Sequence, residues 1–111
     1  MTADGLHLHD LAAVEQHLAG DGLRLLQVGS RSCGVCHALR PRVLALAAEF
    51  GQVHPAIVEL DEVPELASRL HVLTVPVVLL YLQGRELYRA ARFVRLDELR
   101  QQLAQGQRWL E

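Results

Sequence analysis

The chain has 111 residues, which is enough for one folded domain with a single hydrophobic core and too few for two. Half of the residues are hydrophobic, which excludes an intrinsically disordered chain, because burial of that much apolar surface offsets the entropy lost on folding. The formal net charge of −2 argues against a nucleic-acid-binding protein, which needs a clustered positive surface to displace counterions. We therefore expect residues 1–111 to form one domain that binds no nucleic acid.

The first half of the chain alternates between short apolar runs, which predict buried strands, and apolar residues at helical spacing. Gly20 and Gly22 end the first helical pattern, and Pro41 predicts a kink inside the second. In order, the pattern predicts a strand at 6–8, a helix at 10–19, a strand at 23–28, a helix from Cys33 that ends at Gly51, and a strand at 53–60.

Prolines and a glycine mark the predicted boundaries of helices and strands in the second half of the chain. Pro64 suits the first turn of a short helix, and Pro76 suits the entrance of a strand, where its missing N–H costs little. The dipeptide Gln83-Gly84 is typical of a hairpin turn. The predicted elements are a helix at 64–70, strands at 75–82 and 86–94, a helix at 96–105, and a polar end whose last residues fray. The order β-α-β-α-β-α-β-β-α predicts an α/β fold with a mixed sheet flanked by helices.

The two cysteines lie in one motif, Cys33-Gly34-Val35-Cys36, at the junction between a predicted strand and a helix. A sulfur at a helix N-terminus is stabilised as the thiolate, which is the form that attacks disulfides, so Cys33 is the candidate nucleophile. Cys36 returns almost one turn later, close enough to attack the resulting mixed disulfide. Gly34 removes side-chain bulk beside the attacking sulfur. The motif therefore predicts thiol–disulfide exchange.

The sequence shows no pattern typical of an exported or membrane-bound protein. Residues 1–8 contain no basic region and no long apolar run, so we expect no signal peptide and no membrane span. Two cysteines three positions apart do not form the spread disulfide framework of a secreted domain. We expect a cytoplasmic monomer.

The chain resembles the thioredoxin family over roughly its whole length. Cys33-Gly34-Val35-Cys36 is similar to the C-G-x-C active site, and Pro41 falls where the family kinks the following helix. Thr74-Val75-Pro76 is similar to the segment whose proline is cis and faces the active site, and Gly84 falls at the turn between the last two strands. The resemblance implies the thioredoxin fold and an oxidoreductase that reduces disulfides.

The resemblance also implies how substrates are held. Val75 is expected to pair its backbone with an extended substrate, with a cis bond to Pro76, whose ring lies beside the sulfurs. Substrates would be disulfide-containing proteins or small thiols. The protein would bind no metal or other cofactor, because a recycling reductase supplies the reducing equivalents.

Several positions depart from the family pattern. Ser32 stands where the family usually has tryptophan, and Val35 replaces the proline of C-G-P-C. The family's buried acid beneath the second cysteine falls on Gln27, its paired lysine on Ile57, and a glycine of the substrate groove on Arg92. Because an amide cannot take a proton as a carboxylate can, we expect slower resolution of the mixed disulfide than in an ordinary thioredoxin.

Three side chains are candidates for lowering the pKa of Cys33. His37 follows Cys36 directly and could favour the thiolate or shuttle protons, as imidazole side chains can, and Arg31 and Arg92 add positive charge. The alternative for each is a solvated surface residue without a role in the chemistry.

Other functions fit parts of the same motif. Cys33 to His37 also reads C-x-x-C-H, the attachment motif of c-type haem, which a Soret band on the purified protein would reveal. Both cysteines with histidines could complete a zinc site, which metal analysis would reveal. A thioredoxin fold can also serve as a binding or adaptor module with weak or no redox turnover, because fold does not determine function.

Overall fold

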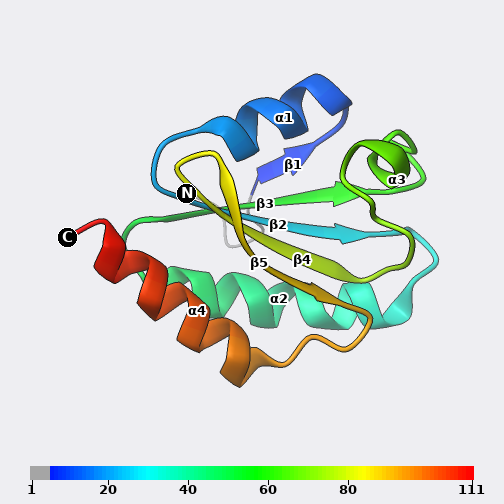
Figure 1. The fold of residues 1–111 in the computed structure, drawn as a ribbon. Helices are drawn as coiled ribbons and strands as arrows, with labels where there is room; N and C mark the ends of the chain where they lie inside the picture. The colour runs from blue at the N-terminus through cyan, green and yellow to red at the C-terminus, as the bar shows by residue number, and fades with distance from the viewer. Residues whose placement is uncertain (1–5) are drawn as a thin grey trace.

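The computed structural model describes residues 6–111, so residues 1–5 of the segment searched for a signal peptide lie outside it. The element order agrees with the predicted one (Figure 1). The elements are β1 (Leu6–Leu8), α1 (Leu11–Ala19), β2 (Leu23–Gly29), α2 (Gly34–Ala48), β3 (Val53–Glu59), α3 (Leu66–Arg69), β4 (Val77–Leu82), β5 (Arg85–Ala91) and α4 (Leu96–Trp109).

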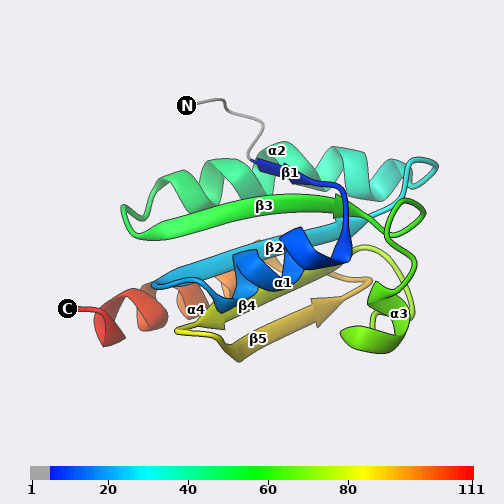
Figure 2. The same cartoon turned by 90° about the horizontal axis from the view of Figure 1, so that it is seen from above.

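The five strands form one mixed sheet in the order β1-β3-β2-β4-β5 (Figure 2). β1 and β2 both pair with β3 in parallel, and β4 pairs with β2 and β5 in antiparallel fashion. Parallel neighbours need a crossover connection, which α1 and α2 supply, whereas Gln83-Gly84 joins β4 to β5 directly. Both turn residues have positive φ, at 51° and 81°, as the predicted tight hairpin requires. The mixed α/β sheet is confirmed.

Helices cover both faces of the sheet, with α1 on one face and α2 and α4 on the other (Figure 1). Side chains alternate along β2, so Leu26 and Val28 pack in the core cluster under α1, whereas Leu23 and Leu25 pack in the cluster under α2 and α4. By the same alternation, Gln27 belongs to the face that α2 covers. The sheet therefore places Gln27 beneath the helix that begins beside Cys33.

Several boundaries differ from the prediction. α2 ends at Ala48, three residues before Gly51, and α3 begins at Leu66 rather than at Pro64. β4 begins only after Pro76, which has no N–H to donate, and β5 ends at Ala91, because Arg92 adopts a φ of +67° and turns the chain out of the strand. Pro41 lies inside α2 as expected, and the kink there stays a prediction.

The largest error concerns the C-terminal helix, which continues to Trp109 instead of ending near residue 105. Gly106 explains the difference, because it is buried and lets the helix backbone approach the sheet closely. A Cβ on Gly106 would lie 2.6 Å from Cδ2 of Leu23 and 3.2 Å from Cδ2 of Leu87. The polar residues around Gly106 conceal this contact in the sequence. Trp109 itself is 71% exposed at the end of the helix.

Replacing Gly106 with alanine is expected to lower the free energy of unfolding by about 1–3 kcal/mol. The added methyl group would overpack a fully buried leucine, and this cost exceeds the gain in helix propensity of up to ~1 kcal/mol. Urea unfolding followed by circular dichroism measures the change. Gln105→Ala, at the exposed neighbouring position, is the control and should stay within ~0.5 kcal/mol of wild type. A Gly106→Ala protein as stable as wild type would contradict the close approach.

His17 of α1 gives the stability a pH dependence. Its ring is 6% exposed and its Nε2 donates to the carbonyl oxygen of Leu25 at 3.1 Å. Burial holds the pKa of His17 below its ordinary value of 6.5, although the hydrogen bond to Leu25 opposes the shift. The unfolded chain therefore takes up a proton on His17 more readily than the folded one. The contribution of neutral His17 to the free energy of unfolding is complete above pH 6.5 and is lost as the pH falls from there through the pKa of the folded state.

We expect the stability advantage of wild type over His17→Gln to shrink as the pH falls from about 8 to about 5. Glutamine retains a donor for Leu25 but does not titrate, so the difference between the two proteins isolates His17 from the carboxylates that titrate in both. Chemical unfolding at a series of pH values measures it. A difference that stays constant with pH would show that His17 is not buried in its neutral form.

Candidate active site

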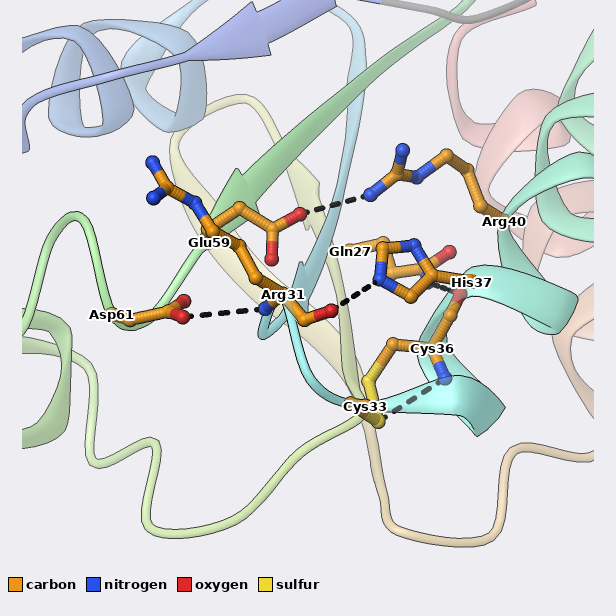
Figure 3. The surroundings of a disulfide bond; sticks show 8 residues. All are labelled: Gln27, Arg31, Cys33, Cys36, His37, Arg40, Glu59 and Asp61. Atoms are coloured by element: carbon orange, nitrogen blue, oxygen red, sulfur yellow. Dashed lines mark hydrogen bonds and ion pairs between the residues drawn. A yellow bond between two sulfur atoms is a disulfide. The ribbon is translucent and has the colours of Figure 1, made fainter.

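The two cysteines lie where β2 ends and α2 begins, at one end of the sheet (Figures 1 and 3). They form a disulfide with their Cα atoms 5.3 Å apart. Cys33 is the N-cap residue of α2, and its Sγ accepts a hydrogen bond from the backbone N–H of Cys36 at 3.2 Å. Cys33 is partly exposed, whereas Cys36 is 1% exposed. A disulfide-containing molecule can therefore reach the first sulfur and not the second.

The N-terminus of α2 favours negative charge on the sulfur of Cys33. The N–H groups of the first helical turn point toward the cap, and no acidic residue lies in that turn. Dipoles of this orientation favour a thiolate over a thiol at a helix N-terminus. Gly34 adds no side chain beside it, and a Cβ on Gly34 would meet no atom within 4 Å. The site can thus present an accessible thiolate with a second sulfur within bonding reach.

The Val75–Pro76 segment leaves the sheet at the same end as the cysteine motif. Val77, the first residue of β4, pairs with Val28 near the end of β2. The Val75–Pro76 peptide bond is cis, as the family resemblance implies. Pro76 is buried, and its carbonyl oxygen accepts a hydrogen bond from the backbone N–H of Arg92 at 2.7 Å. The structure thus brings Arg92 next to the proline loop.

The candidate pKa-tuning residues occupy different surroundings. His37 is exposed, and its Nε2 donates to the carbonyl oxygen of Arg31 at 2.8 Å, which ties α2 to the turn that precedes Cys33. Arg31 is exposed and its backbone N–H donates to Asp61 at 3.3 Å (Figure 3). Arg92 is exposed and has the left-handed φ at which glycine is strain-free, and glycine is the residue that the family pattern places there. An influence of any of the three on Cys33 stays a prediction.

Gln27 lies beneath the second cysteine, where the family pattern places an acid. It is 2% exposed and its Nε2 donates to the carbonyl oxygen of Cys36 at 2.9 Å. Its partners in the sheet are Ile57 on β3 and Val78 on β4. The site therefore holds a buried amide that donates a hydrogen bond, in apolar surroundings, where a carboxylate could accept a proton.

Two features near the site were missed from the sequence. Arg40 on α2 pairs with Glu59 at the end of β3, with 2.9 Å between guanidinium nitrogen and carboxylate oxygen (Figure 3). Arg40 and Glu59 are 19 positions apart, so no local sequence pattern predicts their contact. The one available signal is that Arg40 follows Cys36 by one helical turn, which places it near the site. Three large apolar side chains next to site residues in the chain are also exposed: Val35 at 64%, Leu73 at 85% and Phe93 at 84%.

The described part of the chain offers no site for a metal ion. Among residues 6–111, no three His, Cys, Asp or Glu side chains lie close enough together to hold one. No helix in this part of the chain is both long enough and apolar enough to cross a membrane.

Comparison with known proteins connects this geometry with one family. The thioredoxin family model matches residues 8–105. The thioredoxin-like protein YdfQ of Bacillus subtilis is 34% identical over 104 residues, which cover 94% of this chain and 93% of YdfQ. The thioredoxin of Chlamydia trachomatis is 33% identical over 78 residues, which cover 70% of this chain and 76% of that protein.

The fold is shared with solved structures as well. The crystal structure of thioredoxin from Trypanosoma brucei brucei superposes with a TM-score of 0.83 at 22% identity, over 95% of this chain and 92% of that one. With a cysteine pair of C-x-x-C spacing joined in a disulfide, the family and sequence matches support thiol–disulfide oxidoreductase activity. The chain belongs to the thioredoxin family.

Proposed function

We propose that the protein reduces disulfides by a two-step exchange in which Cys33 attacks and Cys36 resolves. The observation that carries this assignment is the position of Cys33 at the N-terminus of α2, with its sulfur accepting the Cys36 N–H and bonded to the Cys36 sulfur. In the first step the Cys33 thiolate attacks a substrate disulfide, forms a mixed disulfide and releases one substrate thiolate. In the second, Cys36 attacks Cys33, the intramolecular disulfide forms and the other substrate sulfur leaves.

Substrate recognition is proposed to use the backbone beside the sulfurs. Val75 would pair with an extended substrate segment as an added strand, while Pro76 and Gly34 leave the backbone close to Cys33. The exposed Val35, Leu73 and Phe93 would add apolar contacts with protein substrates. We expect disulfide-containing proteins, as well as small disulfides, to be reduced.

The setting that suits this activity is a reducing compartment such as the cytoplasm, in which a recycling reductase returns the pair to the dithiol. We propose that residues 1–111 act there as one domain and as a monomer. Arg31, Arg92 and His37 would favour the Cys33 thiolate through their positive charge or proton exchange.

Reduction of insulin by dithiothreitol tests the assignment. The protein should accelerate precipitation of the insulin B chain well above the rate with dithiothreitol alone. Reduced protein alkylated at the accessible Cys33 with iodoacetamide is the matched control, because it loses the attacking sulfur while Cys36 stays buried. Equal rates with native and alkylated protein would contradict a redox function and favour the binding or adaptor module.

Gln27→Asp is expected to speed insulin reduction about tenfold near neutral pH, because a carboxylate beneath Cys36 can accept its proton. The buried amide of Gln27 is the observation that favours a slowly turning or adaptor-like protein, so this variant also measures how much that amide limits turnover. Gln101→Asp, at an exposed position on α4, adds the same charge away from the site and should leave the rate unchanged. A Gln27→Asp protein no faster than wild type would contradict the proton-transfer argument.

A further inference from the structure

A carboxylate that no motif predicted, that of Glu59, lies near Cys36 on the same face of the sheet as Gln27. Glu59 ends β3, and one of its carboxylate oxygens accepts a hydrogen bond from Arg40 at 2.9 Å. The two side chains are 14% and 23% exposed, respectively. The second carboxylate oxygen, Oε2, is buried and has no hydrogen-bond partner in the structure, and it points away from Arg40 (Figure 3).

The free oxygen of Glu59 and the sulfur of Cys36 lie near the same point, the position that a side chain on Gly29 would occupy. β2 and β3 run side by side there, because Gly29 pairs with Glu59 and its carbonyl oxygen accepts from the Leu60 N–H at 2.7 Å. The position that a Cβ on Gly29 would take is 3.3 Å from the Cys36 Sγ and 3.9 Å from the Glu59 Oε2. Because glycine has no side chain, residue 29 places no atom between the two groups beyond its backbone.

The unpartnered oxygen of Glu59 shares its state with Gln27 Oε1 and Arg40 Nε, and what sets it apart is a charged group placed near the sulfur of Cys36. A buried polar atom without a partner is destabilising, and a charged one more so. A two-point pairing with Arg40 would have satisfied both carboxylate oxygens, yet Arg40 contacts only one. Unsatisfied buried groups in native structures call for an explanation such as a catalytic role or a bridging water. Here the unsatisfied oxygen and the sulfur that must lose a proton both lie within 4 Å of the position that a Cβ on Gly29 would take.

We propose that Glu59 takes over the role of proton acceptor for Cys36 during resolution, with Arg40 as the residue that positions it. This inference rests on the proposed function. The Cys36 thiol passes its proton through one water molecule to Glu59, and the resulting thiolate attacks the Cys33 sulfur of the mixed disulfide. The Cys33–Cys36 bond forms, the bond from Cys33 to the substrate breaks, and the substrate sulfur leaves with the electron pair. The proton on Glu59 then returns to solvent.

Removing the charge of Glu59 would change the rate of resolution in opposite directions, depending on whether Glu59 accepts a proton or acts only as a nearby negative charge. Arg40 from α2 pairs with Glu59, and the other charged or titratable side chains drawn with it are Arg31, His37 and Asp61 (Figure 3). If Glu59 acted only as a nearby negative charge, its removal would favour the Cys36 thiolate and speed resolution. If Glu59 accepts the proton, its removal slows resolution and moves the pH profile of that step upward.

Stopped-flow reaction of the reduced protein with Ellman's reagent resolves the two steps. Attack by Cys33 releases one coloured thionitrobenzoate in a first phase, and resolution by Cys36 releases a second in a later phase. In Glu59→Gln the first phase should be unchanged, whereas the second should slow about a hundredfold at neutral pH and recover at higher pH. Circular dichroism confirms that the variant is folded, and its amide oxygen can still accept from Arg40.

Two further variants complete the test. Glu65→Gln removes the same charge at an exposed position beside α3 and should leave both phases unchanged. Gln27→Asp in the Glu59→Gln protein returns a carboxylate to the space beneath Cys36 and should speed the second phase by about tenfold or more. A second phase that is unchanged or faster in Glu59→Gln, slowing of both phases together, or a double variant as slow as Glu59→Gln would overturn the inference. A wild-type protein without a first phase would contradict the proposed function itself, and this inference with it.

Discussion

Replacing Cys33 with serine is expected to reduce disulfide reduction to the background rate of dithiothreitol alone. A serine hydroxyl at this helix terminus stays protonated at neutral pH, and it cannot form the mixed disulfide from which the second step starts. Because Cys33 is the accessible sulfur of the pair, Cys36 cannot replace it: Cys36 lies in the first turn of α2 and is 1% exposed. The insulin assay with wild type and Cys33→Ser side by side measures the loss.

The structure supplies a control for Cys33→Ser. Serine is a good N-cap residue, so its hydroxyl can accept the Cys36 N–H that Cys33 accepts now, and the reduced variant should keep the stability of reduced wild type within ~1 kcal/mol. A loss of activity without loss of folding then belongs to the sulfur. Activity equal to that of wild type would place the nucleophile elsewhere and would favour the adaptor-module alternative.

Replacing Cys36 with serine is expected to stop turnover after the first step and to accumulate the mixed disulfide. Cys33 keeps its place at the N-terminus of α2 and still attacks, but no second sulfur lies within reach to release the substrate. Incubation with a cell extract, followed by non-reducing electrophoresis and mass spectrometry, should show covalent adducts that dithiothreitol removes.

The double variant Cys33→Ser/Cys36→Ser is the control for trapping and should carry no adduct. Adducts on Cys36→Ser that disappear from the double variant identify Cys33 as the attacking sulfur. If Cys33→Ser with Cys36 intact trapped as many substrates as Cys36→Ser, the order of attack and resolution would be reversed. If neither single variant trapped anything, the adaptor-module alternative would gain weight.

Much of the fold could be predicted because its signals are local. The Gln83-Gly84 turn, the apolar run of β4 and the helical spacing after Cys33 each lie within a few consecutive residues, and the order of elements then limits the sheet to few topologies. The cysteine motif is equally local, and so is its position at a strand–helix junction. The resemblance added the cis bond at Pro76, which no local pattern in the chain requires.

The remaining features depend on contacts between distant segments. The extension of α4 follows from the packing of Gly106 against Leu23, which the polar sequence around Gly106 does not reveal. The Arg40–Glu59 pair arises only when α2 lies across the end of β3. Substitution of the family's acid by Gln27 was visible in the sequence, but the carboxylate of Glu59 near Cys36 was not.

The position of the tryptophan at the end of α4 limits which spectroscopic methods can report the redox state of the cysteine pair. The single tryptophan of the chain, Trp109, is exposed near the C-terminus, at the opposite end of the molecule from the cysteines (Figure 1). Serine occupies the position before Cys33 at which the family usually has tryptophan. Intrinsic fluorescence therefore gives no optical record of whether the pair is oxidised or reduced, and thiol-specific reagents or mass shifts on alkylation have to supply that record.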